Sequence, residues 1–437
     1  MPHDTLWHYN VSPDEDPVLN HPVLQRQRGH KQLGQIEAIH PSASHTRYDH
    51  CGLVAGITDK ICRILEKKER LPGPRKDLVN FAKLHDLGHP PFSHVVEYVL
   101  REITGVDHKT RALHLLEDPE RDSEGRTLRD CLELYRVDFA NLVSLVNETN
   151  PTHKIITDKT LGADKLGYTL KDADMVGYPH LPPSWERLIK HFTFYDGIGV
   201  ELKKGEKQLD DPVTLLCAMQ HFYFDMYLNV YLCPESIAYG RHIQRAVELA
   251  INSGIIAPDS IWDMSEGALE HAINNGHDKA KSRDVRDAMR PFLTRDPYSP
   301  AIALKLAEYQ CDSINGERVF VLSPQELQEL SEAYKPPRAL TALEDRLRER
   351  TGTPCIVCLP PEPSKIKAAD VPLYDNGRRT TTLRELRPKH YDSIREKVDS
   401  FYALRIRVPK QDRDLFVRRY GDDFKHVLLE EARKTTV

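Results

Sequence analysis

The segment KLHDLGHPPFSH, residues 83 to 94, restricts what this chain can fold into more than any other stretch. It places three histidines and an aspartate within twelve positions. Gly88, Pro90 and Pro91 interrupt any long helix through it, because glycine and proline disfavour the helix interior. The segment is therefore either a polar loop that happens to be rich in histidine or part of a shell around a ligand.

Helical periodicity dominates the sequence up to about residue 310. Leu53, Ile57, Ile61 and Ile64 follow helical spacing and are succeeded by lysines, which suit a helix C-terminus. The stretches HVVEYVLREI and ESIAYGRHIQRAVELAINSG have the same pattern, whereas the charged segment 198–212 predicts a hairpin or loop. These patterns predict a mainly α chain with a helical body in residues 1–310.

From about residue 311 the pattern changes to short strands. ERVFVLS, TPCIVCLPP and FYALRIRVP are β-branched or aromatic runs, separated by proline-rich connections and helices such as TALEDRLRERTG. This composition predicts a smaller mixed α/β lobe over residues 311–437, with a role in oligomerisation or regulation. Cys355 and Cys358 lack a second Cys or His pair at zinc spacing, so we expect them to be core residues beside a strand.

Composition excludes several classes of protein. The 437 residues are 40% hydrophobic and 29% charged, which is typical of a soluble globular protein. The net charge of -5 gives no electrostatic reason to expect nucleic-acid or membrane binding. No stretch approaches the roughly 20 apolar residues of a membrane span, and the polar start MPHDTLWHYNVSPDED lacks a signal-peptide core. Scattered cysteines in apolar settings fit a reducing compartment, so we expect a cytoplasmic protein.

Four separate segments carry side chains of metal-binding type: SHTRYDH, LHD, DHK around His108, and ADKLGY. The candidate ligands are His50, His85, Asp86 and Asp164. Two imidazoles and two carboxylates suit a divalent ion such as manganese, iron, magnesium or zinc with open coordination positions, and do not choose among them. His85 and Asp86 cannot share a helix face, but they can bind one metal if a helix end points at it. His89 falls one helical turn after His85, which predicts that the two share a face.

The segment ADKLGYTLKDAD arranges polar groups along one helix face. Asp164, Tyr168 and Asp172 recur at i, i+4 and i+8, and Lys165 follows the first of them. A solvated polar face would explain this row in an isolated helix. Beside a His/Asp cluster, a row of carboxylate, ammonium and phenol groups favours a ligand that satisfies them.

These segments, in this order, resemble a known family. QLG (32–34), SHTRYDH (44–50), HDLGHPPFSH (85–94), DHK (107–109) and DKLGY (164–168) are similar to the motifs of HD-domain phosphohydrolases. The closest likeness is to the deoxynucleoside triphosphate (dNTP) triphosphohydrolase branch, which includes the animal sterile-alpha-motif and HD-domain dNTPase. The resemblance covers residues from about 22 to about 310, and it implies an all-helical HD core.

The resemblance implies a role for each matching residue. The family's metal ligands match His50, His85, Asp86 and Asp164. The histidines that line its phosphate path match His89, His94 and His108, and one of these serves in acid–base catalysis. Arg47 matches an arginine on the α-phosphate, while Lys165 and Tyr168 match contacts to the outer phosphates. Gln32 and Asp172 match positions near the sugar hydroxyl, and Tyr239 matches a tyrosine in a later helix.

The resemblance also implies a reaction and an assembly. In the family, water activated by the metal attacks the α-phosphorus, cationic groups stabilise the charge, and a histidine protonates the leaving oxygen. The products are a deoxynucleoside and triphosphate. Relatives form homo-oligomers with activating nucleotides at their interfaces, and Arg26 matches a position near such an allosteric site. The biological role is open between control of nucleotide pools and antiviral defence.

Two departures from the family keep other functions open. His108 is followed by Lys109, where the triphosphohydrolases commonly have glutamate, and no arginine lies between Asn229 and Gly240 to hold the γ-phosphate. Arg241 could substitute. A second hypothesis is therefore hydrolysis of a nucleoside mono- or diphosphate, a signalling nucleotide or a nucleic-acid phosphodiester. A third is a nucleotide sensor without catalysis.

Some histidines also have structural explanations. His94 could brace the Pro-Pro turn, and His108 could be a surface histidine in a loop. Nothing in spacing or resemblance ties His45 or His114 to the site, so both are assigned structural roles.

Overall fold

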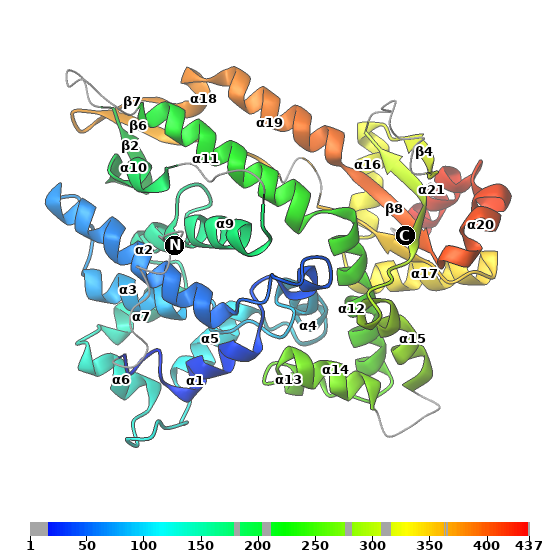
Figure 1. Cartoon of the computed structure of the whole chain (residues 1–437), viewed down its shortest axis with the longest axis horizontal. Helices are drawn as coiled ribbons and strands as arrows, with labels where there is room; N and C mark the ends of the chain where they lie inside the picture. The colour runs from blue at the N-terminus through cyan, green and yellow to red at the C-terminus, as the bar shows by residue number, and fades with distance from the viewer. Residues whose placement is uncertain are drawn as a thin grey trace. The chain divides into compact units, whose positions relative to one another are not determined.

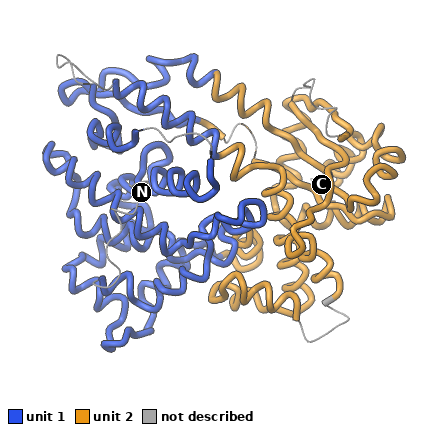
Figure 2. Tube along the Cα trace, in the orientation of Figure 1, with its two compact units in different colours: residues 1–93, 106–226, 368–392 blue, residues 94–105, 227–367, 393–437 orange. Residues whose placement is uncertain are grey.

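The computed structural model describes residues 16–178, 184–202, 211–275, 282–306, 316–361, 363 and 366–435. The chain is mainly helical, as predicted (Figure 1). The core that was expected to be all-helical also contains strands, at Phe192–Phe194, Ile198–Glu201 and Ser299–Lys305, so that part of the prediction is wrong. The chain forms two compact units, each assembled from segments that are separated in sequence (Figure 2). The first unit comprises residues 1–93, 106–226 and 368–392, and the second comprises 94–105, 227–367 and 393–437. The predicted domain boundary near residue 310 lies outside the described residues, so the division into 1–310 and 311–437 stays a proposal.

The first unit contains most of the helices before residue 226 and one small sheet. Its helices are α1 (Pro22–Gln25), η3 (Arg26–Gly29), η4 (Gly34–Ala38), α2 (Arg47–Lys67), α3 (Arg75–Leu84), α5 (His108–Leu116), α6 (Leu128–Leu134), α7 (Phe139–Val146), η5 (Pro151–His153), α8 (Lys154–Thr157), α9 (Ala163–Met175), α10 (Trp185–Ile189), α11 (Pro212–Met226), α18 (Leu383–Leu386) and the start of α19 (Pro388–Phe401). Its strands are β1 (Phe192–Phe194), β2 (Ile198–Glu201), β6 (Pro372–Asp375) and β7 (Arg378–Thr382).

The sheet of the first unit joins distant parts of the chain. Its strand order is β1-β2-β6-β7, and β2 pairs in parallel with β6 so that Val200 lies opposite Leu373. The segment predicted as a hairpin or loop, 198–212, begins as strand β2, and residues 203–210 lie outside the described part. Late residues of the chain are therefore needed to complete this unit.

Helix α2 is the central element of the first unit. Thr46 begins it with a capping box, in which the Thr46 side chain accepts from the Asp49 amide and the Asp49 carboxylate accepts from the Thr46 amide. Its apolar face buries Leu53, Ile57 and Ile61 completely or almost completely, as the helical spacing predicts. Helices α3 and α9 both pack against α2.

A glycine lets α9 approach α2 closely. A Cβ atom on Gly167 would lie 2.9 Å from the Val54 side chain, so a larger residue would push the helices apart. Gly167 stands three residues after Asp164 on α9, and Val54 stands four residues after His50 on α2. The close packing of these helices therefore brings their two candidate metal ligands together.

The second unit consists of helices and a second small sheet. Its helices are α4 (His94–Thr104), the π-helix η6 (Tyr227–Tyr231), α12 (Pro234–Asn252), α13 (Pro258–Ile261), α14 (Glu266–Asn274), α15 (Ser282–Leu293), α16 (Pro324–Ala333), α17 (Pro337–Thr351), the rest of α19, η9 (Lys410–Asp412), α20 (Arg413–Tyr420) and α21 (Phe424–Thr435). Its strands are β3 (Ser299–Lys305), β4 (Arg318–Val321), β5 (Ile356–Cys358) and β8 (Ala403–Val408).

The sheet of the second unit has the order β4-β3-β8-β5. The three strands predicted from ERVFVLS, TPCIVCLPP and FYALRIRVP are β4, β5 and β8, so those predictions are confirmed. Cys355 and Cys358 are buried at β5, as expected of core residues. Among the described residues, no helix combines the length and the apolar composition that crossing a membrane requires.

Candidate metal centre

The candidate metal centre begins at two helix ends. His50 lies in the first turn of α2, directly after its cap, and His85 is the C-cap residue of α3. Asp86 follows immediately, so the helix end presents an imidazole and a carboxylate together, as predicted. The prediction that His89 shares a helix face with His85 is wrong, because α3 ends at Leu84. The turn at Gly88, Pro90 and Pro91 ends the helical spacing.

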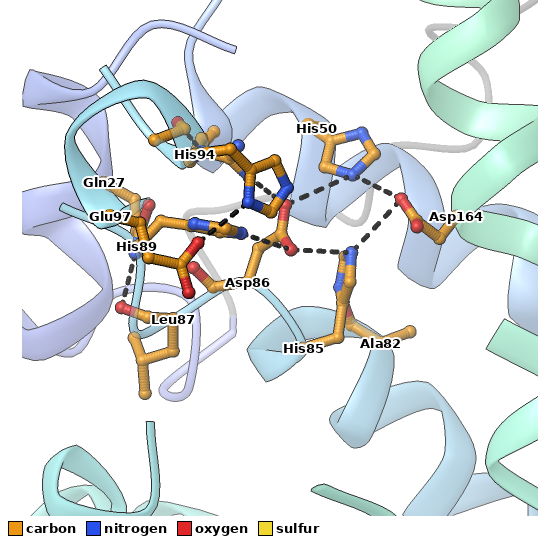
Figure 3. Close-up of polar contacts among 12 residues, drawn as sticks. Gln27, His50, Ala82, His85, Asp86, Leu87, His89, His94, Glu97 and Asp164 are labelled. Atoms are coloured by element: carbon orange, nitrogen blue, oxygen red, sulfur yellow. Dashed lines mark hydrogen bonds and ion pairs between the residues drawn. The ribbon is translucent and has the colours of Figure 1, made fainter. Parts of the chain in front are cut away.

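His50, His85 and Asp164 come together in the first unit (Figure 3). Nε2 of His50 lies 3.0 Å from Oδ1 of Asp164, and Nε2 of His85 lies 3.4 Å from the same oxygen. The three side chains offer ligand atoms that all lie within 4.8 Å of one another. This group could hold a metal ion.

Asp86, which directly follows the C-cap residue of α3, is the fourth candidate metal ligand. Its carboxylate lies 3.6 Å from Nε2 of His85 and 3.7 Å from Nε2 of His50, and its other strong partner is the guanidinium of Arg47. Burial alone would raise the pKa of Asp86, but Arg47 and the neighbouring histidines hold that pKa well below its usual range. Asp86 is therefore an ionised carboxylate that faces both predicted histidine ligands.

The orientation of His85 suits a metal ligand. Nδ1 of His85 donates a hydrogen bond to the Ala82 carbonyl oxygen at 2.8 Å, so Nε2 is the ring nitrogen that faces the centre. Nε2 is buried and makes no hydrogen bond to any described residue. Burial lowers the pKa of His85, but Asp86 and Asp164 outweigh it and raise the pKa to about 9. A buried nitrogen that faces two carboxylates fits a divalent cation.

His89 and His108 stack beside this centre. Nε2 of His89 lies 3.5 Å from Oδ1 of Asp86, and the two imidazole rings are parallel with centroids 4.3 Å apart. The stacking depends on Gly88, because a Cβ atom there would lie 1.8 Å from the His108 carbonyl oxygen. His108 opens α5 and packs in the first unit, whereas the alternative explanation placed it in a surface loop.

Arg47 is held on two sides. Its Nη1 forms an ion pair with Asp86, and its Nε donates to the hydroxyl oxygen of Ser93 at 2.7 Å. Sequence reasoning missed Ser93, although it stands within the conspicuous PPFSH stretch. It also missed Gln27, whose side-chain amide donates to the Leu87 carbonyl oxygen at 2.7 Å. Arg26 donates to that same carbonyl at 2.6 Å, so it supports the turn after Asp86.

Helix α9 carries the polar row that its spacing predicts. Lys165 places its ammonium 3.4 Å from the centre of the Tyr223 ring and donates to the Lys159 carbonyl oxygen at 2.6 Å. Burial lowers the pKa of Lys165 to about 8. Tyr168 also meets Tyr223, with ring centroids 6.3 Å apart.

Asp172 and Gln32 lie at either side of a buried histidine. Oδ1 of Asp172 lies 2.8 Å from Nε2 of His45, and both side chains are buried. Gln32 donates its backbone amide to the His45 carbonyl oxygen at 2.9 Å, and its side-chain oxygen is buried without a hydrogen bond to any described residue. His45 therefore connects two residues that the resemblance places near the sugar, although spacing alone gave no reason to include it.

Two predicted site residues belong to the second unit. His94 is the first residue of α4, and its Nδ1 lies 2.8 Å from a carboxylate oxygen of Glu97. Tyr239 on α12 packs edge to face against Phe292. The substitution of Arg241 for the absent arginine is not supported, because its guanidinium is buried and donates to both oxygens of Glu344.

Comparisons with known proteins extend the family resemblance. No family model matches the chain. The uncharacterized protein MJ1154 of Methanocaldococcus jannaschii is 28% identical over 282 residues, 63% of this chain and 55% of that protein. Deoxynucleoside triphosphate triphosphohydrolase SAMHD1 of Gallus gallus is 34% identical over 123 residues, 25% of this chain and 19% of that protein. The putative HD domain-containing protein L394 of Acanthamoeba polyphaga mimivirus is 30% identical over 113 residues, 22% of this chain and 24% of that protein.

The match thus spans about half or less of each curated relative. A crystal structure named as a phosphohydrolase, from Bacteroides thetaiotaomicron, matches the fold with a TM-score of 0.58 at 18% identity, over 89% of this chain and 93% of that one. At that identity the likeness concerns the fold alone. Together with the motif residues gathered at one centre, these relatives confirm that the chain resembles the HD-domain phosphohydrolases, in the branch that includes the dNTP triphosphohydrolases.

Proposed function

We propose that the chain is a metal-dependent phosphohydrolase that acts on nucleotides. The observation that carries the proposal is the buried group of His50, His85 and Asp164, with Asp86 facing both imidazoles. A divalent ion held there would act as a Lewis acid and supply a water nucleophile at neutral pH. The identity of the ion is open between manganese, iron, magnesium and zinc.

The surrounding residues would bind and orient the substrate. Arg47 is the nearest guanidinium to the carboxylate of Asp86, and its charge would stabilise anionic phosphate oxygens. His89 and His108 are adjacent imidazoles whose ordinary pKa lies near neutrality, so either can hold or deliver a proton to a leaving oxygen. His94 is the third candidate for that role from the family resemblance.

The finer proposal is hydrolysis of a dNTP to a deoxynucleoside and triphosphate. It is supported by the relatives that carry this activity in their names and by the polar row on α9. In this assignment Lys165 and Tyr168 would contact the outer phosphates, and Gln32 and Asp172 would lie toward the sugar. Tyr239 on α12 is the remaining substrate contact that the family resemblance assigns.

A nucleotide with fewer phosphates is the second candidate, and two observations favour it. Arg241 is committed to Glu344, so the described part of the second unit offers no replacement at that position for the expected γ-phosphate arginine. Lys109, which stands where the family commonly has glutamate, forms an ion pair with Glu148 at 2.7 Å. A nucleic-acid phosphodiester or a purely sensing role has no such support.

The test is a product assay in isotopic water. The purified protein is loaded with each of the four metals and incubated with each dNTP, singly and mixed, in ¹⁸O-labelled water. Ion-pairing chromatography with mass spectrometry should find deoxynucleoside and triphosphate in equal amounts. Water that attacks the α-phosphorus breaks the bond to the 5′ oxygen, so the label should enter the triphosphate and not the nucleoside.

Metal removal provides the control. Chelated protein should lose all turnover and recover it when the metal is restored. Turnover of nucleoside mono- or diphosphates in the same assay, with no turnover of any dNTP, would assign the site to the second candidate. Release of monophosphate and pyrophosphate from a dNTP would refute the triphosphohydrolase assignment. A metal-loaded protein that turns over no nucleotide at all would refute the enzymatic proposal.

A further inference from the structure

The side chain of Arg47 is fixed by a residue that the family resemblance does not assign. Nε of Arg47 donates to Oγ of Ser93 at 2.7 Å, and both residues are buried. With Nε engaged, the terminal nitrogens of the guanidinium remain for anionic partners, and Nη1 already meets the carboxylate of Asp86. The arginine therefore has one end anchored and one end directed at the metal centre.

The backbone that carries Ser93 is strained. Phe92 and Ser93 adopt consecutive left-handed conformations, with φ of 57° and 51°, and neither is glycine. Such conformations cost about 1–2 kcal/mol for each residue that carries a Cβ atom. Glycine would occupy position 93 without this penalty. The serine at this position is thus unfavourable for the local backbone, and its hydroxyl is the group that makes the contact to Arg47.

The strained turn is held in place by its surroundings. The Phe92 side chain is buried, and the Phe92 backbone lies against Gly34, where an added Cβ atom would be 3.5 Å from the Phe92 Cα atom. Gly34 itself has a positive φ of 48°. Packing on both sides of the turn therefore determines the direction of the Ser93 hydroxyl.

We propose that Ser93 is a positioning residue that orients the Arg47 guanidinium for end-on binding of phosphate oxygens through Nη1 and Nη2. This inference rests on the proposed function, because it names how that site holds its anionic substrate. A free arginine side chain loses considerable rotamer freedom when it binds an anion. An arginine already anchored through Nε has lost that freedom in advance, which strengthens anion binding.

A double-mutant cycle tests the proposal without requiring turnover. Calorimetry would measure the affinity of the manganese-loaded protein for inorganic tripolyphosphate in four forms: wild type, Ser93→Ala, Arg47→Ala and the double variant. We expect Ser93→Ala to weaken binding about tenfold, the lower end of the scale of one hydrogen bond to a charged group. In the Arg47→Ala background the same change should have no effect, because Ser93 acts through Arg47.

Two further substitutions separate positioning from a merely structural role. Ser93→Gly relieves the strained φ that Ser93→Ala retains, so it should melt at a higher temperature than Ser93→Ala, yet bind tripolyphosphate equally weakly. Ser93→Thr keeps the hydroxyl but strains the backbone further, because β-branched residues disfavour this region. It should lower the melting temperature and retain the affinity. A structural role predicts that stability and affinity change in the same direction in both variants.

Glu69→Gly is the matched control for backbone strain. Glu69 is exposed and has a similar φ of 55°, so this variant should gain stability with unchanged affinity and turnover. If Ser93→Ala weakens binding equally with and without Arg47, the positioning role is refuted while the proposed function stands. If the wild-type protein turns over nucleotides but the four forms bind tripolyphosphate equally, the same conclusion follows. If the wild type neither binds tripolyphosphate nor turns over nucleotide, both fail together.

Discussion

The two units each bury a cluster of charged side chains, and the clusters are satisfied very differently. In the second unit, Glu344 accepts two hydrogen bonds on each oxygen. Arg241 and the Val357 amide donate to one oxygen at 2.8 and 2.9 Å, and Arg241 and Arg245 donate to the other at 3.0 and 2.9 Å. In the first unit, Nε2 of His85 is buried beside two carboxylates without a hydrogen bond to a described residue.

We infer from this difference that the charged groups around Glu344 support folding, whereas those around His85 form a site for a ligand. In the second cluster both oxygens of the central carboxylate accept hydrogen bonds, although Nη1 of Arg241 is buried without a hydrogen bond to a described residue. In the first cluster the nitrogen without a hydrogen bond faces two carboxylates, which is a favourable position for a cation. The first cluster therefore has the character of a binding site, and the second has the character of a structural network. Substitutions in the first cluster should consequently reduce activity more than stability, and substitutions in the second should reduce stability more than activity.

The largest expected effect is loss of function at Asp164. Asp164→Ala removes the carboxylate that both His50 and His85 face, so metal content and phosphohydrolase activity should fall to background together. The melting temperature of the metal-free protein should change little. Elemental analysis, the product assay and thermal denaturation measure the three quantities.

Asp174→Ala is the control, since Asp174 is an exposed carboxylate on the same helix. It should retain metal and activity. Activity that survived Asp164→Ala would exclude a metal mechanism at this site and remove the contrast between the clusters.

A substitution at Glu344 should have the opposite result, because stability should be lost while metal binding is kept. Glu344→Ala leaves the buried Arg241 and the partly buried Arg245 without their shared carboxylate, which should lower the free energy of unfolding by about 3–5 kcal/mol. Metal binding by the protein that remains folded should be unchanged. Denaturant titration measures the stability, and Glu349→Ala, an exposed glutamate on the same helix, should cost little. A stable Glu344→Ala protein would show that the network contributes nothing to folding.

Gly88 tests how far the first cluster depends on backbone packing. Gly88→Ala places a methyl group 1.8 Å from the His108 carbonyl oxygen and 2.7 Å from the Ala112 amide, so the start of α5 must shift. We expect a loss of about 1–3 kcal/mol in stability and a reduced turnover with retained metal. Gly267→Ala, where an added Cβ meets nothing within 4 Å, should be neutral or stabilising. Unchanged turnover in Gly88→Ala would argue against a role for His108 at this position.

The effect that is smallest at neutral pH concerns acid sensitivity in the second unit. Burial lowers the pKa of His242 to about 3, with further lowering by Arg407. The folded-state pKa lies below the unfolded value of about 6.5, so this stability is present above that pH and is lost as pH falls toward 3. The loss should approach about 1 kcal/mol per pH unit between these values.

His242→Gln removes the titrating imidazole and with it this pH-dependent loss of stability. Its stability relative to wild type should therefore rise as the pH is lowered from 7 to 4.5, as measured by urea titration at each pH. A difference that did not depend on pH would mean that His242 is already solvated in the folded chain.

Local patterns predicted the elements whose information lies within a short stretch. The helix after Thr46 carries its own cap and apolar spacing, and the strands β5 and β8 are β-branched runs between prolines. Strand β3 was missed, because SPAIALK is recognisable only through its partner: Ile302 pairs with Ile406 on β8, far along the chain. Strand β6, PLYD, contains no β-branched residue, and it pairs with β2 across an even larger separation.

The residues of the candidate site divide into the same two groups, those recognisable from local sequence and those recognisable only through a distant partner. The grouping of His50, His85, Asp86 and Asp164 was predictable, because imidazoles and carboxylates in these motifs are the side chains that commonly bind metals. His45 and Ser93 were not, because their importance comes from a single partner that the fold supplies: Asp172 for one and Arg47 for the other. The helical argument for His89 was wrong because proline and glycine end α3 early, although the turn still brings His89 to Asp86.

Strands β6 and β7, which complete the first unit from late in the sequence, determine when this unit can fold during synthesis and where the chain can be cut into fragments. The sheet of this unit needs β6 and β7, which lie between Pro372 and Thr382. On the ribosome, β2 must therefore wait for about 170 further residues before its parallel partner emerges. A fragment that stopped near residue 310 would retain every predicted metal ligand but leave β2 with an open edge, so a minimal catalytic piece has to extend past Thr382.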